Sequence, residues 1–393
     1  MYFYIKNREN KLPIVLIPGL FGSLGDDIIL GTGDLNFGMA EPLYRPLINN
    51  LEELGYKEGE NLFIAFYDWR KGCEYNTEKY LIPKIEEAKS ITNSSMVDII
   101  GHSLGGIVAR DYIQGSLYKD DVRNLIMMGT PNAGAVNAYY FWSGGQVPYD
   151  KLEKNLLYQL IKIGFFWIYR FLHGQISDLN ILRNIFPVVQ ELLPSFEYGD
   201  YLFVDDNSGF KKPVNIKNMD ALNSLLSNMN KNIHLIYNKG IKLYHVIGTG
   251  FETTDIICVS HNESESEKWK DGKPLYSISM PYGDGTITIS SAESIYSKNY
   301  YLKENHGDIL KKSKDILASI LKCPTIQTRD KEQKNETRYF YSIILKNISE
   351  TEIVFSRNEK RLNIMKASNT DGYITREMGE NLYWIMINTG LTP

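Results

Sequence analysis

The sequence predicts an α/β protein built on a mostly parallel, doubly wound sheet. Three observations predict it: short apolar runs recur along most of the chain, amphipathic segments alternate with them, and glycine-rich turns follow several runs. A strand that is buried on both faces of a parallel sheet needs such an uninterrupted apolar run. With 43% hydrophobic and 23% charged residues among 393, the chain has the composition of a globular protein with a large core.

The elements can be placed from these patterns in chain order. Residues 13–17 (Pro-Ile-Val-Leu-Ile) predict a buried strand, which ends in a glycine loop at residues 18–23. Apolar side chains at helical spacing over residues 44–54 stop at Gly55, which predicts an amphipathic helix with a glycine C-cap. Further strands are expected at residues 61–66, 96–100, 122–128, 241–248 and 275–280, and further helices at 78–90, directly after 103 and at 306–321.

The apolar run at residues 96–100 leads directly into Gly-His-Ser-Leu-Gly and then into a helix-forming segment. Strand, sharp turn and helix are the order of a nucleophile elbow, in which the turn exposes a serine at the tip of the sheet. Gly101 and Gly105 would leave room where a Cβ atom would collide with the neighbouring strand or helix. We therefore expect Ser103 to be a nucleophile and the fold to be that of an α/β-hydrolase.

The glycine loop at residues 18–23 directly follows the first predicted strand. In α/β-hydrolases, this position supplies one oxyanion donor, and the residue after the nucleophile supplies the other. The expected oxyanion hole therefore consists of the backbone N–H groups of Leu20 and Leu104. The alternative interpretation is an ordinary turn between a strand and a helix.

A serine nucleophile needs a histidine base and an acid that orients it, and in this fold the chain order is serine, acid, histidine. Asp284 follows a predicted strand and is flanked by glycines, and His306 is the one histidine downstream of it. The main rival pair is Asp255 and His261, whose short separation leaves no room for the strand and helix between acid and base loops. The predicted triad is Ser103, Asp284 and His306.

An insertion over about residues 135–235 interrupts the regular alternation and is rich in large apolar side chains. We expect a helical cap over the active site, with Phe21 and Trp69 contributing to an acyl-chain pocket, because burial of each methylene is worth about 0.8 kcal/mol. The competing interpretation is that the insertion's aromatic residues form its own core. Transient contact of the cap with a membrane surface is a weaker expectation, because its polar face is not rich in Lys or Arg.

The remaining segments predict the domain organisation. Residues 1–323 are expected to form the α/β-hydrolase domain, with residues 324–337 as a polar linker. Residues 338–393 contain short β-patterned runs and predict a small β-rich module.

Composition and motif content restrict the function classes. A net charge of −4 without a basic stripe gives no reason to expect nucleic-acid binding. No metal-ligand spacing, phosphate loop or dinucleotide motif is present, so no cofactor is predicted. Three widely spaced cysteines and the absence of a recognisable signal peptide at the start of the sequence lead us to expect a cytoplasmic location.

Several motifs together resemble the lecithin:cholesterol acyltransferase family. They are residues 13–22, 67–70 (Tyr-Asp-Trp-Arg), 101–106, 129–131 (Gly-Thr-Pro) and 283–287 (Gly-Asp-Gly-Thr-Ile), with the late His306. The resemblance covers about residues 10 to 322 and implies an acyl-enzyme mechanism on ester-linked lipids, with Ser103, Asp284 and His306 as the triad. The sequence departs from the secreted animal members in lacking a cysteine pair for their cap disulfide and their signal peptide.

The expected function is that of a serine-dependent lipid acyl hydrolase or O-acyltransferase, with a phospholipid or neutral lipid ester as substrate. One alternative is a carboxylesterase or thioesterase that acts on small soluble acyl compounds. Another is a non-catalytic lipid- or partner-binding protein on a hydrolase scaffold.

Overall fold

The computed structural model describes most of the chain, in two compact units. The described residues are 11–23, 34–145, 179, 183, 186–205, 211–260 and 268–323, together with the backbone of five later strands. The first unit comprises Met1–Gly199, Asp220–Asp255 and Ser279–Ile326, and the second comprises Asp200–Met219, Ile256–Ile278 and Gln327–Pro393.

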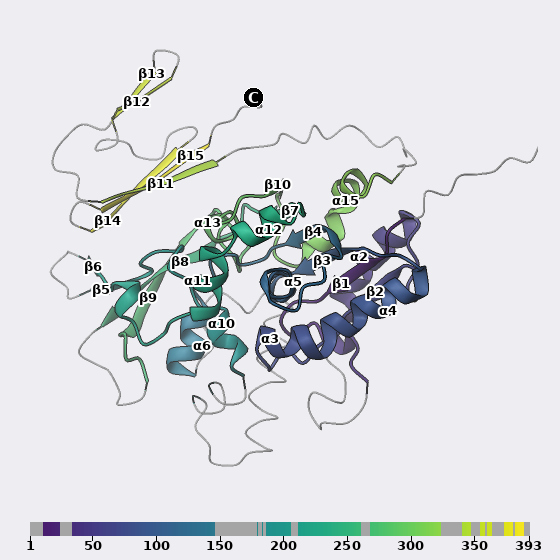
Figure 1. The fold of residues 1–393 in the computed structure, drawn as a ribbon. Helices are drawn as coiled ribbons and strands as arrows, with labels where there is room; N and C mark the ends of the chain where they lie inside the picture. The colour runs from purple at the N-terminus through teal and green to yellow at the C-terminus, as the bar shows by residue number, and fades with distance from the viewer. Residues whose placement is uncertain are drawn as a thin grey trace, which may run out of the picture. The chain divides into compact units, whose positions relative to one another are not determined.

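The first unit is organised on a fully parallel six-stranded sheet with the order β10–β7–β4–β3–β1–β2 (Figure 1). Its strands are β1 (Ile14–Ile17), β2 (Leu62–Ile64), β3 (Val97–His102), β4 (Val122–Met128), β7 (Lys242–Gly248) and β10 (Lys298–Leu302). The sequence pattern predicts five of these six strands. It misses β10 because this edge strand reads Lys-Asn-Tyr-Tyr-Leu and contains no apolar run.

Helices pack on both faces of this sheet, which confirms the doubly wound fold class. The helices are α2 (Glu41–Glu53), α4 (Ile82–Thr92), α5 (Leu104–Gln114), α14 (Asp308–Lys312) and α15 (Lys314–Ile320). One apolar core joins α2, α14 and α15 to alternate strand residues such as Leu16 and Ile100. Helices α4 and α5 also contact β1 but contribute nothing to that core, so they cover the opposite face (Figure 1).

The segment predicted as a helical cap contains strands as well as helices. Its described helices are α6 (Ala138–Gly144), α10 (Val188–Glu191), α11 (Ser224–Lys231) and α12 (His234–Asn238). The strands β5 (Leu202–Asp205) and β6 (Lys211–Pro213) join β8 (Thr253–Ser260) and β9 (Lys273–Met280) in a second, four-stranded sheet. The strand expected at residues 275–280 therefore exists, but it belongs to this second sheet. The aromatic run Phe-Phe-Trp-Ile-Tyr at residues 165–169 of this segment lies outside the described residues.

The β-patterned runs near the end of the sequence form strands, as predicted. They are β11 (Phe340–Lys346), β12 (Val354–Arg357), β13 (Lys360–Asn363), β14 (Tyr373–Gly379) and β15 (Leu382–Asn388). Antiparallel pairing gives a three-stranded sheet, β11–β15–β14, and a hairpin, β12–β13. The predicted linker at residues 324–337 lies outside the described residues. Among the helices that are described, none has the length and apolar character needed to cross a membrane.

Candidate active site

Ser103 occupies a strained turn between β3 and α5. Its backbone has φ 53° and ψ −124°, a conformation that residues other than glycine rarely adopt. Its N–H donates to the Met128 carbonyl at 2.8 Å, which ties the turn to the end of β4. The flanking glycines have the role that the sequence suggests: a Cβ atom at Gly101 would lie 2.7 Å from the Gly106 backbone, and one at Gly105 would overlap the Ile17 carbonyl. The serine itself stays partly exposed.

Asp284 and His306 form a buried pair. His306 Nδ1 lies 2.6 Å from Asp284 Oδ2, and the His306 backbone N–H donates to the Asp284 carbonyl at 2.9 Å. The other carboxylate oxygen, Oδ1, accepts hydrogen bonds from the backbone N–H groups of Thr286 at 2.9 Å and Ile287 at 2.7 Å. Because an ionised carboxylate can only accept hydrogen bonds, the proton of a neutral His306 belongs on Nδ1. Its Nε2 lone pair is then free to accept a proton.

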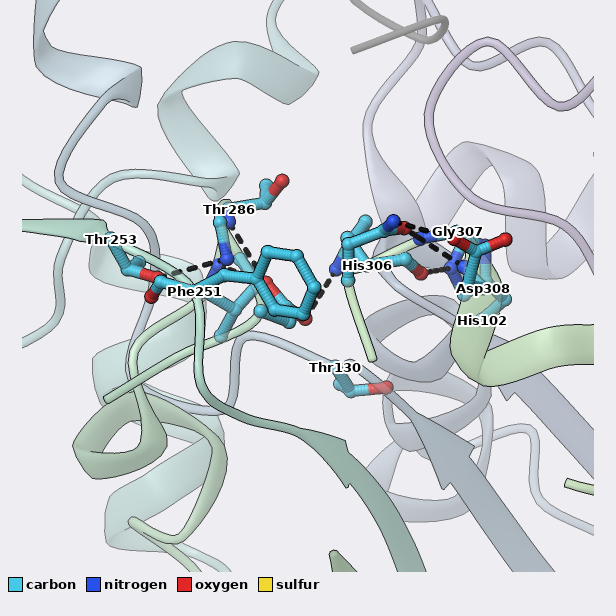
Figure 2. A network of polar contacts seen from close by, with 12 residues as sticks. His102, Thr130, Phe251, Thr253, Thr286, His306, Gly307 and Asp308 are labelled. Atoms are coloured by element: carbon cyan, nitrogen blue, oxygen red, sulfur yellow. Dashed lines mark hydrogen bonds and ion pairs between the residues drawn. The ribbon is translucent and has the colours of Figure 1, made fainter. Parts of the chain in front are cut away.

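The Nε2 atom of His306 is buried and has no hydrogen-bond partner among the described residues. Figure 2 shows His306 between His102 on one side and the loop that carries Thr286 on the other. A buried polar atom without a partner is uncommon and calls for an explanation. A ring nitrogen that has to accept a proton during a reaction would have no fixed partner of this kind.

His306 and the elbow both lie at the carboxyl edge of the parallel sheet. His102, the residue before Ser103, contacts the His306 carbonyl through Nε2 at 3.1 Å, and the two imidazole centroids are 5.0 Å apart. A Cβ atom at Gly129, directly after β4, would lie 3.0 Å from His306 Cε1 and Nδ1. The equivalent position at Gly248, the end of β7, would lie 2.6 Å from Asp284 Cβ. The ends of three neighbouring strands thus hold the three predicted residues.

The glycine loop after β1 lies against the elbow. A Cβ atom at Gly19 would lie 2.8 Å from Ser103 Cβ. The Gly22 N–H donates to the Gly19 carbonyl at 2.9 Å, which closes a turn in which Phe21 has a φ of 61°. The N–H of Leu20 is not used by that turn bond. Leu104 begins α5, so its N–H has no acceptor within the helix.

Phe21 and Trp69, the two residues predicted to contact an acyl chain, pack against each other. Their ring centroids are 4.2 Å apart, and both side chains are buried. Trp69 also stacks on Phe186 at 5.5 Å and donates its indole N–H to the Ser23 carbonyl at 3.1 Å. Their predicted contact with an acyl chain stays a prediction, because residues 24–33 and most of the segment from 146 to 185 lie outside the described part of the chain.

Two other polar side chains, Asp255 and His245, form hydrogen bonds within the fold. Asp255 accepts a hydrogen bond from the Tyr198 hydroxyl at 3.0 Å, and His261 lies outside the described residues. His245 accepts from the Thr130 N–H at 3.0 Å, and burial lowers its pKa to about 3, which keeps the ring neutral. The described residues contain no cluster of His, Cys, Asp and Glu that could hold a metal ion.

One residue at the site, Tyr44 of α2, could not be identified from the sequence. Its hydroxyl contacts both the Gly19 N–H at 2.7 Å and His102 Nδ1 at 2.8 Å. In the sequence, Tyr44 is one of several apolar positions at helical spacing, so only its hydroxyl distinguishes it from the core-facing residues around it. His102, inside the elbow, is buried and uses both ring nitrogens in these contacts, with the Tyr44 hydroxyl and the His306 carbonyl.

Part of the chain matches a known protein family. Residues 36–200 match the model of the lecithin:cholesterol acyltransferase (LCAT) family. The chain carries an LCAT-like α/β-hydrolase fold. The match includes Ser103 and residues 67–70, and it ends before Asp284 and His306.

Solved structures with a similar chain path include two bacterial enzymes. The mature lipase BlEst2 of Bacillus licheniformis is 15% identical over 80% of this chain and 93% of that chain, with a TM-score of 0.42. Phospholipase PlaB from Legionella pneumophila is 11% identical over 96% of this chain and 81% of that chain, with a TM-score of 0.43. No curated protein sequence matches the chain significantly.

Proposed function

We propose that the chain is a serine-dependent acyl hydrolase or O-acyltransferase of ester-linked lipids. The observation that carries this proposal is the buried His306 ring beside the elbow, with Nδ1 bonded to Asp284 and Nε2 unpartnered among the described residues. The LCAT-like fold supports lipid esters as the substrate class. A structural histidine in such a buried position would be expected to use both ring nitrogens, as His245 does.

The proposed reaction begins when His306 Nε2 takes the proton of Ser103 Oγ. The oxygen attacks the ester carbonyl, a new Oγ–C bond forms, and the carbonyl oxygen becomes an oxyanion. The N–H groups of Leu20 and Leu104 would stabilise this charge, assisted by the positive end of α5. His306 then returns the proton to the leaving alcohol as the original C–O bond breaks. Asp284 holds the imidazole in the required tautomer and stabilises its cation.

The resulting acyl-enzyme can react with water or with another hydroxyl group. In either case His306 removes the proton of the acceptor, and Ser103 leaves as its hydroxyl is restored. The two outcomes, hydrolysis and acyl transfer, use the same residues. They differ only in which acceptor reaches the acyl-enzyme.

A fluorophosphonate probe tests the nucleophile. We expect the purified protein to be labelled at Ser103, and Ser103→Ala to lose the label. Ser116→Ala, an exposed serine just beyond α5, is the matched control and should label like the wild type. Absence of labelling in the wild type, or equal labelling of Ser103→Ala, would favour the non-catalytic binding protein and overturn the proposal.

A substrate panel tests the substrate class. Mass spectrometry would follow products from vesicles of mixed phospholipids and neutral lipids, with and without an added alcohol acceptor. We expect Ser103-dependent release of fatty acid, or its transfer to the alcohol. Turnover restricted to short soluble esters or thioesters would instead assign the chain to the carboxylesterase or thioesterase alternative.

A further inference from the structure

The peptide group that joins Pro18 to Gly19 is clamped at both ends by buried tyrosine hydroxyls. Tyr67 Oη donates to the Pro18 carbonyl at 2.9 Å, and the Gly19 N–H donates to Tyr44 Oη at 2.7 Å. Both tyrosines are 1% exposed. Because one hydroxyl holds the carbonyl and the other holds the N–H, rotation of this peptide plane would break a buried hydrogen bond.

This peptide determines where the predicted oxyanion donor points. Leu20 follows it directly, in the turn that the Gly22 N–H closes on the Gly19 carbonyl. Gly19 lies against Ser103, with room for no side chain between them. A small rotation at Gly19 would therefore move the Leu20 N–H relative to the serine oxygen.

Tyr44 extends the clamp to the base. Its hydroxyl lies 2.8 Å from His102 Nδ1, and His102 Nε2 lies 3.1 Å from the His306 carbonyl. A carbonyl only accepts, so Nε2 of His102 carries the proton and Nδ1 accepts from Tyr44. Burial lowers the pKa of His102 to about 3, so the ring stays neutral and this pattern holds across the physiological range.

We propose that Tyr44 is a positioning residue, which through the Gly19 N–H and His102 sets the oxyanion loop and the His306 backbone in register around Ser103. The inference rests on the proposed function and deepens it. Three consecutive hydrogen bonds, all between buried groups, join the loop of the oxyanion donor to the loop of the base (Figure 2 shows the His102–His306 end). Tyr44 touches neither the substrate nor the reacting atoms in this scheme.

The test is Tyr44→Phe, which removes the hydroxyl and keeps the ring. Misplacement of an oxyanion donor or base is expected to lower kcat for a soluble p-nitrophenyl ester by about 10- to 100-fold. KM should stay within about threefold of the wild type, because ground-state binding does not use the oxyanion hole. Affinity for a trifluoromethyl ketone, whose serine adduct carries an oxyanion, should fall in parallel with kcat.

Tyr112→Phe is the matched control. Tyr112 is equally buried, and the variant loses the hydrogen bond from its hydroxyl to Asp121 Oδ1 at 2.7 Å, near the far end of α5. It should lose stability without a change in kcat. If Tyr44→Phe keeps the kcat of this control, the inference is wrong. If the wild type itself shows neither esterase activity nor Ser103 labelling, the proposed function fails instead.

A double-mutant cycle tests whether Tyr44 acts through its hydrogen bond to His102 or only through its own contact with Gly19. His102→Gln can still donate to the His306 carbonyl but offers no ring nitrogen to Tyr44. We expect the kcat losses of Tyr44→Phe and His102→Gln to be non-additive, the double variant being no slower than the slower single variant. If the fold-decrease in kcat of the double variant equals the product of the two single decreases, the two residues are not coupled and the inference is wrong. Should Tyr44→Phe not fold, Tyr67→Phe probes the same peptide from its carbonyl side and must also lower kcat.

Discussion

At the scale of single residues, the site depends on which atom carries each proton. Asp284 uses one carboxylate oxygen for two backbone N–H groups and the other for His306. This division holds the carboxylate rigidly and leaves His306 with Nδ1 protonated. His102 has the opposite tautomer, with the proton on Nε2, because its partners are a hydroxyl and a carbonyl. His102 and His306 are neighbours in space, and their hydrogen-bond partners alone give the two rings different tautomers.

Asp284→Asn should strongly reduce activity while the protein stays folded. The amide oxygen would remain with the two backbone N–H groups, so the NH₂ group would face His306 Nδ1. Nδ1 would then have to accept, the proton would move to Nε2, and the ring could no longer take the Ser103 proton. We expect kcat to fall by about 10⁴-fold in steady-state assays, with little change in thermal midpoint.

Asp255→Asn provides the comparison, since Asp255 belongs to the rival pair and accepts a hydrogen bond from Tyr198. Its kcat should be close to that of the wild type. An equal decrease in kcat in both variants would mean that Asp284 cannot be distinguished from Asp255 as the acid of the triad.

At the scale of elements, α10 contacts the loop that follows Trp69. Glu191, the last residue of α10, accepts a hydrogen bond from the Cys73 N–H at 2.8 Å, at the start of the short helix α3 (Cys73–Asn76). Burial raises the pKa of this carboxyl from 4.5 to about 7, against the hydrogen bonds from Cys73, and the carboxylates of Asp111 and Glu74 add to the rise. The stacking of Trp69 on Phe186 reinforces the same contact.

Glu191→Gln should change the pH dependence of stability. A raised folded-state pKa stabilises the fold fully below the unfolded pKa of about 4.5, and this contribution is lost as pH rises through about 7. The amide cannot ionise, so the variant escapes that loss. We expect its unfolding free energy, relative to the wild type, to be about 1 to 3 kcal/mol higher near pH 8 than near pH 5.

Urea unfolding at both pH values would measure this difference. A variant-to-wild-type difference that is the same at both pH values would mean that Glu191 does not titrate with a raised pKa in the folded state.

At the scale of the whole molecule, all residues of the candidate site belong to the first unit. Tyr44 and Ser103 come from its first chain segment, and Asp284 and His306 come from its last; the parallel sheet also lies entirely within it. The strands after residue 339 belong to the second unit, together with residues 200–219 and 256–278. The separate module predicted at residues 338–393 stays a prediction.

A chain that ends at Cys323 tests this organisation. Because the sheet and the site residues precede that point, we expect the truncated protein to fold and to be labelled at Ser103 within about threefold of the full-length rate. Circular dichroism and fluorophosphonate labelling would measure the two properties. A truncated chain that folds but is not labelled would show that the last residues contribute to the site.

The sequence by itself determined the fold class, five of the six parallel strands and the candidate residues at their ends. It could do so because a strand buried on both faces requires an apolar run, and because a serine elbow requires glycines at defined positions. It could not find β10, whose polar residues lie at a sheet edge, or the second sheet, which pairs β5 and β6 with β8 and β9 from a distant part of the chain.

Only the tertiary structure decided how the site is held. The hydroxyl of Tyr44 becomes significant because α2 brings it to Gly19 and His102, residues that are 25 and 58 positions away in the chain. A hydrogen bond depends on distance and direction, whereas periodicity reports only which face of an element is buried. For the same reason, the sequence could suggest Asp284 and His306 as acid and base from their order along the chain. The tautomer of His306 and its unpartnered Nε2 could be recognised only from the coordinates.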